Sequence, residues 1–187
     1  MIQWGLPTTI TVEGVDYPIY SDYRDVLDVL DVLNDEEMHV QMRFSVALGA
    51  FLQDVDALPP EHVDAACREM VRFIALGEDD QPDSAPSVRR FDWDQDALLI
   101  VADVNKVAGT EIRALEYLHW WTFLAYFSSI GEGRLSTVVG IREKLRKGKP
   151  LDEHERQYYR ENRAAVDLKT KYTKSEEALL EEFLGLR

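Results

Sequence analysis

The stretch Glu116-Tyr-Leu-His-Trp-Trp-Thr-Phe-Leu-Ala-Tyr-Phe127 holds two of the four tryptophans of this 187-residue chain side by side. Neighbouring residues on a helix point about 100° apart, so these aromatic and aliphatic side chains would cover most of a helix surface. A helix that is apolar nearly all round is typical of a buried position. We therefore predict a central core helix over residues 110–130, with Thr110 as its N-cap and Gly131 just past its end.

On both sides of this stretch, apolar residues recur at helical spacing between capping residues, glycines and prolines. Before them, apolar and polar residues alternate around Glu13-Gly14, where Gly14 can supply the positive φ of a tight turn. Two capping boxes are predicted, one from Asn34 and one from Asp152. The further helices that we predict span residues 21–33, 34–55, 61–76, 97–107, 135–146, 152–168 and 175–184.

The fold class predicted from these elements is mainly α, a helical domain of about six or seven helices with a small N-terminal β-hairpin. A chain of 187 residues with 45% hydrophobic and 30% charged residues suits one sizeable core. We expect a single domain over residues 1–187. Its parts are the hairpin (8–20), the N-terminal helices (21–76), an acidic loop (77–90), an aromatic-rich helical core (91–168) and a C-terminal helix (169–187).

The sequence also restricts the compartment and the partners. Cys67 is the only cysteine, which excludes an internal disulfide and a thiolate zinc cluster. The chain begins without a signal peptide, and no apolar run approaches the roughly 20 residues that span a bilayer. Residues 1–100 carry 21 Asp and Glu against 6 Lys and Arg, within a net charge of −14. We therefore expect a cytoplasmic protein that binds neither membrane nor nucleic acid.

Two groups of residues could hold a metal, and neither has the required pattern. Asp92, Asp94 and Asp96 have the spacing that opens a calcium-binding loop, but Ala97 replaces the glycine of its sixth position. Capping of the following helix explains these aspartates better. The four histidines stand far apart, and for His119 a buried position with a hydrogen bond to backbone, or a partner contact, explains the residue better than catalysis. We expect no enzyme activity, metal or cofactor.

The one basic run is Arg142-Glu-Lys-Leu-Arg-Lys-Gly-Lys149, with five positive charges and one negative. Lys and Arg complement the dipole at a helix C-terminus, which favours a solvated helix end. The alternative is a patch that meets an acidic partner or the chain's own acidic half.

Three stretches in this order resemble the phage "gene product fifteen" family. They are Leu6-Pro with Val12-Glu-Gly-Val-Asp-Tyr-Pro-Ile-Tyr-Ser-Asp-Tyr-Arg24, then Phe91-Asp-Trp-Asp-Gln-Asp96, then Leu118-His-Trp-Trp-Thr-Phe123. Members carry Gly-x-x-Tyr-x-Ile-x-x-Asp-Phe-Arg, Phe-Asp-x-Asp and Leu-His-Trp-Trp-x-Phe at these places, and Tyr23 stands where the family usually has Phe. The family-motif residues, expected in the core or at an interaction site, are Tyr17, Asp22, Arg24, Phe91, Asp92, Asp94, Leu118, His119, Trp120, Trp121 and Phe123.

The resemblance implies a role in phage tail assembly. Genes of this family typically lie between those for the major tail protein and the tape-measure protein, the place of tail assembly chaperones. The expected partners are therefore the tape-measure protein, the major tail protein and further copies of the chain in a weak homo-oligomer. Two other functions stay open, a head-tail connector or tail-completion protein retained in the virion, and an adaptor that binds a host protein.

Overall fold

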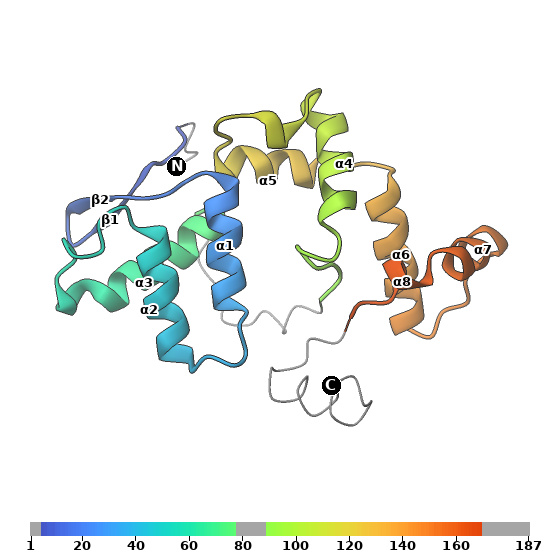
Figure 1. Ribbon diagram of the computed structural model, residues 1–187, viewed down its shortest axis with the longest axis horizontal. Helices are drawn as coiled ribbons and strands as arrows, with labels where there is room; N and C mark the ends of the chain where they lie inside the picture. The colour runs from blue at the N-terminus through green and yellow to red at the C-terminus, as the bar shows by residue number, and fades with distance from the viewer. Residues whose placement is uncertain (1–4, 78–88, 170–187) are drawn as a thin grey trace, which may run out of the picture. The chain divides into compact units, whose positions relative to one another are not determined.

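The computed structural model describes residues 5–77 and 89–169 (Figure 1). Within these residues the chain is mainly helical, with eight α-helices and an N-terminal two-stranded antiparallel hairpin, so the predicted fold class is confirmed. The described residues form two compact units. Unit 1 comprises residues 5–77 and 119–121, and unit 2 comprises residues 89–118 and 122–169. The prediction of one domain over the whole chain stays a prediction.

The hairpin consists of β1 (Thr9–Val12) and β2 (Val15–Pro18), and confirms the prediction for residues 8–20. Glu13 and Gly14 have φ values of 50° and 81°, the positive pair of a type I′ turn, whose twist suits a two-residue hairpin. Ile10 pairs with Tyr17 across the strands, and both side chains are buried. The hairpin therefore contributes one apolar face to the core of unit 1.

Three helices complete unit 1. They are α1 (Tyr23–Leu33), α2 (Val40–Phe51) and α3 (Val63–Ile74), the last preceded by the 3₁₀ turn η1 (Pro60–His62). Asp22 caps α1 by accepting from the Arg24 amide at 3.0 Å. α1 packs on α2, and α3 packs on both α2 and β1. The largest buried side chains of these elements are Val12, Val26, Val29, Leu48, Phe51 and Met70.

The prediction for residues 34–55 is wrong at both ends of the helix. Asn34 is the C-cap of α1, and Asp35 accepts from the Glu37 amide in a turn, so no capping box opens a helix at Asn34. α2 ends at Phe51 because Leu52 adopts an extended conformation and bridges to Ile19 of the segment after β2. Tertiary backbone pairing therefore overrides the helical periodicity of this stretch.

The predicted helix over residues 61–76 is confirmed as η1 and α3, which end in a Schellman motif. The Gly77 amide donates to the Arg72 carbonyl at 2.7 Å and the Leu76 amide to the Phe73 carbonyl at 3.2 Å. Leu76 adopts the left-handed conformation, with φ of 60°. This turn ends α3 and fixes the position of its last carbonyls in unit 1.

Unit 2 contains α4 (Ala97–Ala108), the 3₁₀ turn η2 (Ile112–Ala114), α6 (Arg134–Arg146), α7 (Glu153–Glu161) and α8 (Arg163–Val166). α5 (Trp120–Ser128) contributes its first two residues to unit 1 and the remainder to unit 2. The predicted helices over residues 97–107 and 135–146 are confirmed as α4 and α6. Val138, Ile141 and Val166 form a buried cluster at which α6 meets α8.

Two predicted helices of this region are longer than the real ones. The helix predicted over residues 110–130 is limited to α5, because Glu111 accepts from the Arg113 amide to form η2 and His119 bridges to Asp22 in extended backbone. The helix over residues 152–168 starts at the confirmed Asp152–Glu155 capping box but breaks at Asn162, whose φ is −125°. Long-range pairing of His119 shortens the first of these helices at its start, and a local break at Asn162 divides the second.

The predicted helix over residues 175–184 and all but the edges of the acidic loop over residues 77–90 lie outside the described residues. None of the helices in residues 5–77 and 89–169 combines the length and the apolar character that a membrane span requires.

Candidate functional site

His119 joins three segments of unit 1 at the start of α5. Its Nδ1 accepts from the Trp121 amide at 3.0 Å, and its Nε2 lies 2.9 Å from the Pro7 carbonyl. Because a carbonyl only accepts, Nε2 must carry the hydrogen and Nδ1 must be free of one. The ring is therefore a neutral imidazole that serves as the N-cap of α5 while holding the segment before β1.

The surroundings of His119 keep it neutral. Its side chain is 2% exposed, and the Phe73 ring stands edge-on to it at 5.8 Å. Burial lowers the pKa of His119, and the hydrogen bond to the Pro7 carbonyl offsets this only in part. The structure thus gives His119 a buried position with a hydrogen bond to backbone, the first of the two alternatives that the sequence leaves open.

Trp120 and Trp121 fasten the start of α5 to the end of α3. The Trp120 Nε1 donates to the Ile74 carbonyl at 3.0 Å, and the Trp121 Nε1 donates to the Phe73 carbonyl at 2.9 Å. The last four carbonyls of a helix have no partner within the helix. The Trp120 indole satisfies the Ile74 carbonyl, and the Trp121 indole adds a second donor to the Phe73 carbonyl, which also accepts from the Leu76 amide. Trp120 is 1% exposed, whereas Trp121 is half-buried and stacks on Phe73 at 5.8 Å.

Three of the other motif residues lie in the same unit. Tyr17 is buried in the hairpin, and Asp22 bridges to His119 while capping α1. Arg24 pairs with Asp22 at 3.3 Å and stacks over the Tyr23 ring at 4.9 Å. The backbone of Ser21 accepts from the Trp120 amide at 2.8 Å. Unit 1 therefore brings together the first family stretch and the His119–Trp121 segment.

The remaining motif residues lie in unit 2. Phe123 is buried there and stands 6.1 Å from Trp93, and Phe91 lies 4.8 Å from the same ring. Phe127 joins both, at 5.3 Å from Phe91 and 5.2 Å from Trp93. Leu118 is also buried. Phe91 of the second family stretch and Phe123 of the third thus join one aromatic cluster. Trp93 and Phe127 complete it, although neither is among the family-motif residues.

The three aspartates before α4 have different roles. Asp92 accepts from the amides of Asp94 and Gln95, at 3.1 Å and 2.7 Å, and so caps the turn that leads into α4. Asp94 is exposed, and Asp96 is buried without capping α4 through its side chain. Asp92 therefore caps the turn before α4, whereas α4 itself starts at the N-cap residue Asp96 without a side-chain cap. The carboxylate of Asp96 instead forms a buried ion pair with an arginine of the same chain.

That cation is Arg142, the first residue of the basic run. Its Nη1 and Nη2 donate to the two carboxylate oxygens of Asp96 at 2.6 Å and 2.9 Å, and both side chains are buried. The same guanidinium donates to the carbonyls of Arg90, Ala165 and Val166. A solvated helix end is thus wrong for Arg142, because a bidentate acceptor and three carbonyls replace its water.

The rest of the basic run is more exposed. Lys144 pairs with Glu155 of α7, while Arg146 and Lys147 share Glu143. These hydrogen bonds hold the pKa of Glu143 at about 2. Nothing in the residue order distinguishes Arg142 from its neighbours except helical phase, since it follows Ile141 and lies four residues after Val138, both buried.

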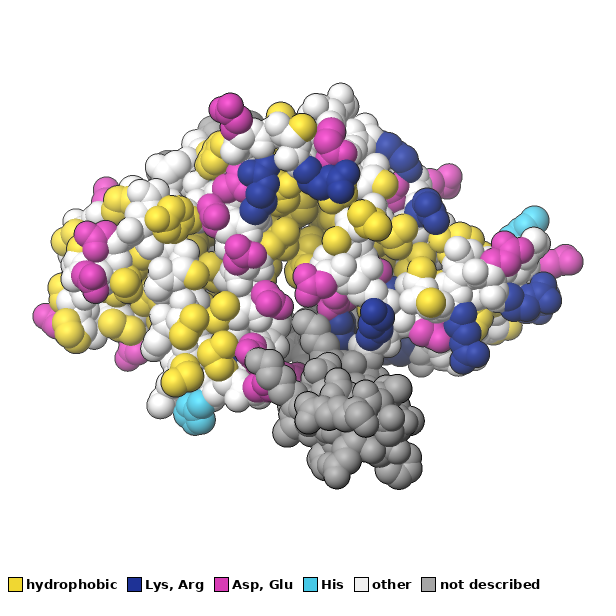
Figure 2. Space-filling view, viewed as in Figure 1, with side chains coloured by type: hydrophobic (Ala, Val, Ile, Leu, Met, Phe, Trp, Pro, Cys, Tyr) yellow, Lys and Arg dark blue, Asp and Glu magenta, His cyan; other side chains and the backbone are white. Residues whose placement is uncertain are grey.

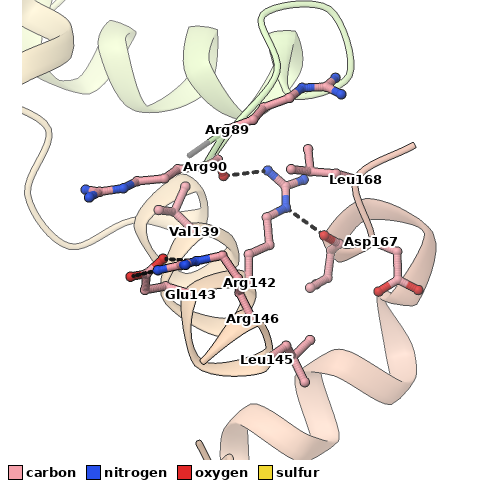
Figure 3. Close-up of a pocket in the computed structure, with 10 residues that line it drawn as sticks. Arg89, Arg90, Val139, Arg142, Glu143, Leu145, Arg146, Asp167 and Leu168 are labelled. Carbon is pink, nitrogen blue, oxygen red and sulfur yellow. Dashed lines mark hydrogen bonds and ion pairs between the residues drawn. The ribbon is translucent and has the colours of Figure 1, made fainter. Parts of the chain in front are cut away.

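A hollow of about 240 Å³ opens beside Arg142 in unit 2 (Figure 3). Figure 3 shows the Arg142 guanidinium directed at the Arg90 backbone, with Arg146 held by Glu143 on the neighbouring turn. The less exposed apolar floor of the hollow consists of Val139, Val166 and Leu168, and the exposed charged residues at its mouth are Arg89, Arg90, Arg146 and Asp167. Its lining residues are Arg89, Arg90, Val139, Arg142, Glu143, Leu145, Arg146, Val166, Asp167 and Leu168.

The outer face of α2 is the other surface that the sequence did not reveal. It consists of the exposed residues Met42, Ser45, Val46, Gly49 and Ala50, none of them charged. Met42 is 59% exposed and Val46 45%. Figure 2 shows hydrophobic side chains over α2 next to a column of acidic side chains over α1. Arg43, the one charged residue of α2, turns away and donates to the Leu33 carbonyl.

In residues 5–77 and 89–169, no three His, Cys, Asp or Glu side chains form a group that could hold a metal ion. Comparison with known proteins gives one informative result. No curated protein and no solved structure matches the chain, whereas the model of the Bacteriophage Gp15 protein family matches residues 3–168. The chain therefore belongs to the bacteriophage Gp15 protein family.

Proposed function

We propose that this chain is a phage tail assembly chaperone. It binds the tape-measure protein and also the major tail protein, and it catalyses no reaction. The observation that carries the proposal is the uncharged outer face of α2. A chaperone for a long, apolar, helical protein needs an exposed apolar surface that can accept one face of a helix.

The outer face of α2 differs from those of its neighbours in unit 1. α1 presents Asp25, Asp28 and Asp31, and the exposed residues of α3 include Asp64 and Arg68. α2 buries Ala47, Leu48 and Phe51 inward and still exposes methionine and valine outward. Packing within unit 1 accounts for the inner face only, so the outer face is available to a partner.

The acidic surroundings of this face support the same function. Charged residues at the edge of an apolar contact select the partner and limit non-specific association. The acidic side chains of α1 lie beside α2 and give such an edge (Figure 2).

The test is co-expression with the tape-measure protein encoded beside this gene. The wild-type chain should keep the partner in the soluble fraction and co-purify with it. Met42→Glu combined with Val46→Glu should reduce the co-purified partner at least tenfold, because two carboxylates would be buried in an apolar contact. If the partner is equally insoluble with and without the wild-type chain, the proposal fails.

Leu98→Glu provides the matched control. Leu98 is 74% exposed on α4, so the change introduces the same chemistry at an exposed leucine outside the outer face of α2. This variant should capture the partner as well as the wild type does. Mass spectrometry of purified particles separates the other candidates, since a connector would be present in stoichiometric amount and a chaperone nearly absent.

A further inference from the structure

The mouth of the hollow in unit 2 carries positive charge that the fold leaves uncompensated. Arg142 is neutralised by Asp96, Arg89 pairs with Asp92, and Arg146 shares Glu143 with Lys147. Arg90 lines the mouth and Lys149 follows at the same end of α6. Both are exposed, and neither pairs with an acidic side chain among the described residues. This cationic excess is unusual in a chain of net charge −14.

The opposite feature occurs on α1 in unit 1. Asp25, Asp28 and Asp31 follow each other at three-residue spacing, so neighbouring carboxylates repel along one side of the helix. The last turn of α1 contains no basic residue, and Asp31 lies at the negative end of the helix dipole. No ion pair to these three aspartates forms within residues 5–77 and 89–169, and Arg24 beside Asp25 offsets only part of the charge of this acidic stripe of α1.

The two surfaces are complementary in charge. We propose that the mouth of the hollow binds the acidic stripe of α1 from a second copy of this chain. Because the two surfaces are different patches, each bound copy still presents one free stripe and one free mouth, and the association continues head to tail. The apolar floor of Val139, Val166 and Leu168 would lose its remaining water on docking, which strengthens the charge pairs at the mouth.

This inference shares the acidic side chains of α1 with the proposed function, but it uses neither the outer face of α2 nor the tape-measure protein, so a test on the chain alone separates the failure of one from the failure of the other. Its test is sedimentation velocity of the full chain over a range of concentrations. At 50 mM NaCl the mean sedimentation coefficient should rise with concentration. At 500 mM NaCl self-association should weaken by about tenfold, because exposed charge pairs are screened. A wild-type chain that stays monomeric at every concentration in 50 mM NaCl overturns the proposal.

Two charge-reversal variants identify the surfaces. Asp28→Lys with Asp31→Lys makes the stripe basic, and Arg90→Glu with Lys149→Glu makes the mouth acidic. Each variant alone has two like-charged surfaces and should lose self-association at least tenfold. Mixed in equal amounts, the two variants have complementary surfaces in both directions and should associate as well as the wild type. A mixture whose components sediment as they do separately contradicts the assignment of these surfaces.

Asp56→Lys with Asp64→Lys provides the control for net charge. Both aspartates are exposed in unit 1 away from the acidic stripe, and the change in charge equals that of the stripe variant. Self-association should stay within twofold of the wild type. Equal losses in this variant and the stripe variant would mean that net charge, rather than the stripe, controls association.

Discussion

Unit 1 and unit 2 each contain a buried polar attachment between segments far apart in sequence, and the two attachments differ in charge. In unit 1 the donors are neutral, because the Trp120 and Trp121 indoles donate to carbonyls at the end of α3. In unit 2 the charged Arg142 donates to Asp96 and to backbone carbonyls.

This difference determines how a single substitution lowers the stability of each unit. Removing a neutral indole costs its packing and removes one hydrogen bond to a backbone carbonyl. Removing one member of a buried ion pair leaves a charge without compensation, while removing both can be nearly neutral. The attachment in unit 1 should therefore respond to lost volume, and that in unit 2 to lost charge balance.

The largest expected effect is that of Trp120→Ala. The side chain is 1% exposed, so the change should lower the free energy of unfolding by about 4 to 5 kcal/mol, measured by denaturant titration. Trp121→Ala should cost about half as much because its ring is only half-buried. Equal losses for the two variants would contradict the different burial of the rings.

The second effect tests the charged attachment. Arg142→Met keeps the length of the side chain but leaves the Asp96 carboxylate buried without its cation, and should cost about 3 to 4 kcal/mol in the free energy of unfolding. Arg146→Met, one turn on and paired at the surface with Glu143, should cost less than about 1 kcal/mol. Combining Arg142→Met with Asp96→Asn should recover part of the loss. If the combination is no better than Arg142→Met alone, uncompensated charge is not the cause.

Sequence reasoning found the attachment in unit 1 more readily than that in unit 2. Tryptophans side by side mark a core position by composition alone, and the hairpin and most helices follow from apolar periodicity and turn residues. Arg142 is one of five cations in eight residues, and only tertiary contact shows which of them is buried. Likewise, the extended backbone at His119 depends on its bridge to Asp22, 97 positions earlier in the sequence, which no local pattern encodes.

Gly133 provides a probe of packing in unit 2. It precedes α6, where the buried Asp103 carboxylate accepts from the Leu135 amide at 2.9 Å, and a Cβ at Gly133 would overlap that carboxylate. Gly133→Ala should therefore cost about 1 to 3 kcal/mol by thermal or denaturant unfolding. Gly140→Ala is the matched control, because its Cβ meets nothing and alanine favours a helix interior by about 0.5 to 1 kcal/mol. Destabilisation by both would indicate that α6 tolerates no added volume.

The smallest effect is the pH dependence of stability that His119 contributes as the cap of α5. Burial lowers the pKa of His119 in the folded chain, so the unfolded chain binds the proton first as the pH falls below about 6.5. Stability is then fully present above this pH and declines as the pH falls toward the folded-state pKa, with a slope no steeper than about 1.4 kcal/mol per pH unit. Protonation at Nδ1 would also place a hydrogen against the Trp121 amide that it now accepts from.

The measurement is the free energy of unfolding between pH 7.5 and 5, compared with His119→Gln and with His39→Gln as the exposed control. His119→Gln should be less stable at pH 7.5 and lose the slope that His119 contributes, whereas His39→Gln should keep the wild-type slope. Glu111 and Glu143, with pKa values of about 2, titrate in a more acidic range and do not contribute to this slope. A wild-type slope that survives in His119→Gln would show that another group controls stability in this range, and that the neutral cap of α5 does not respond to pH.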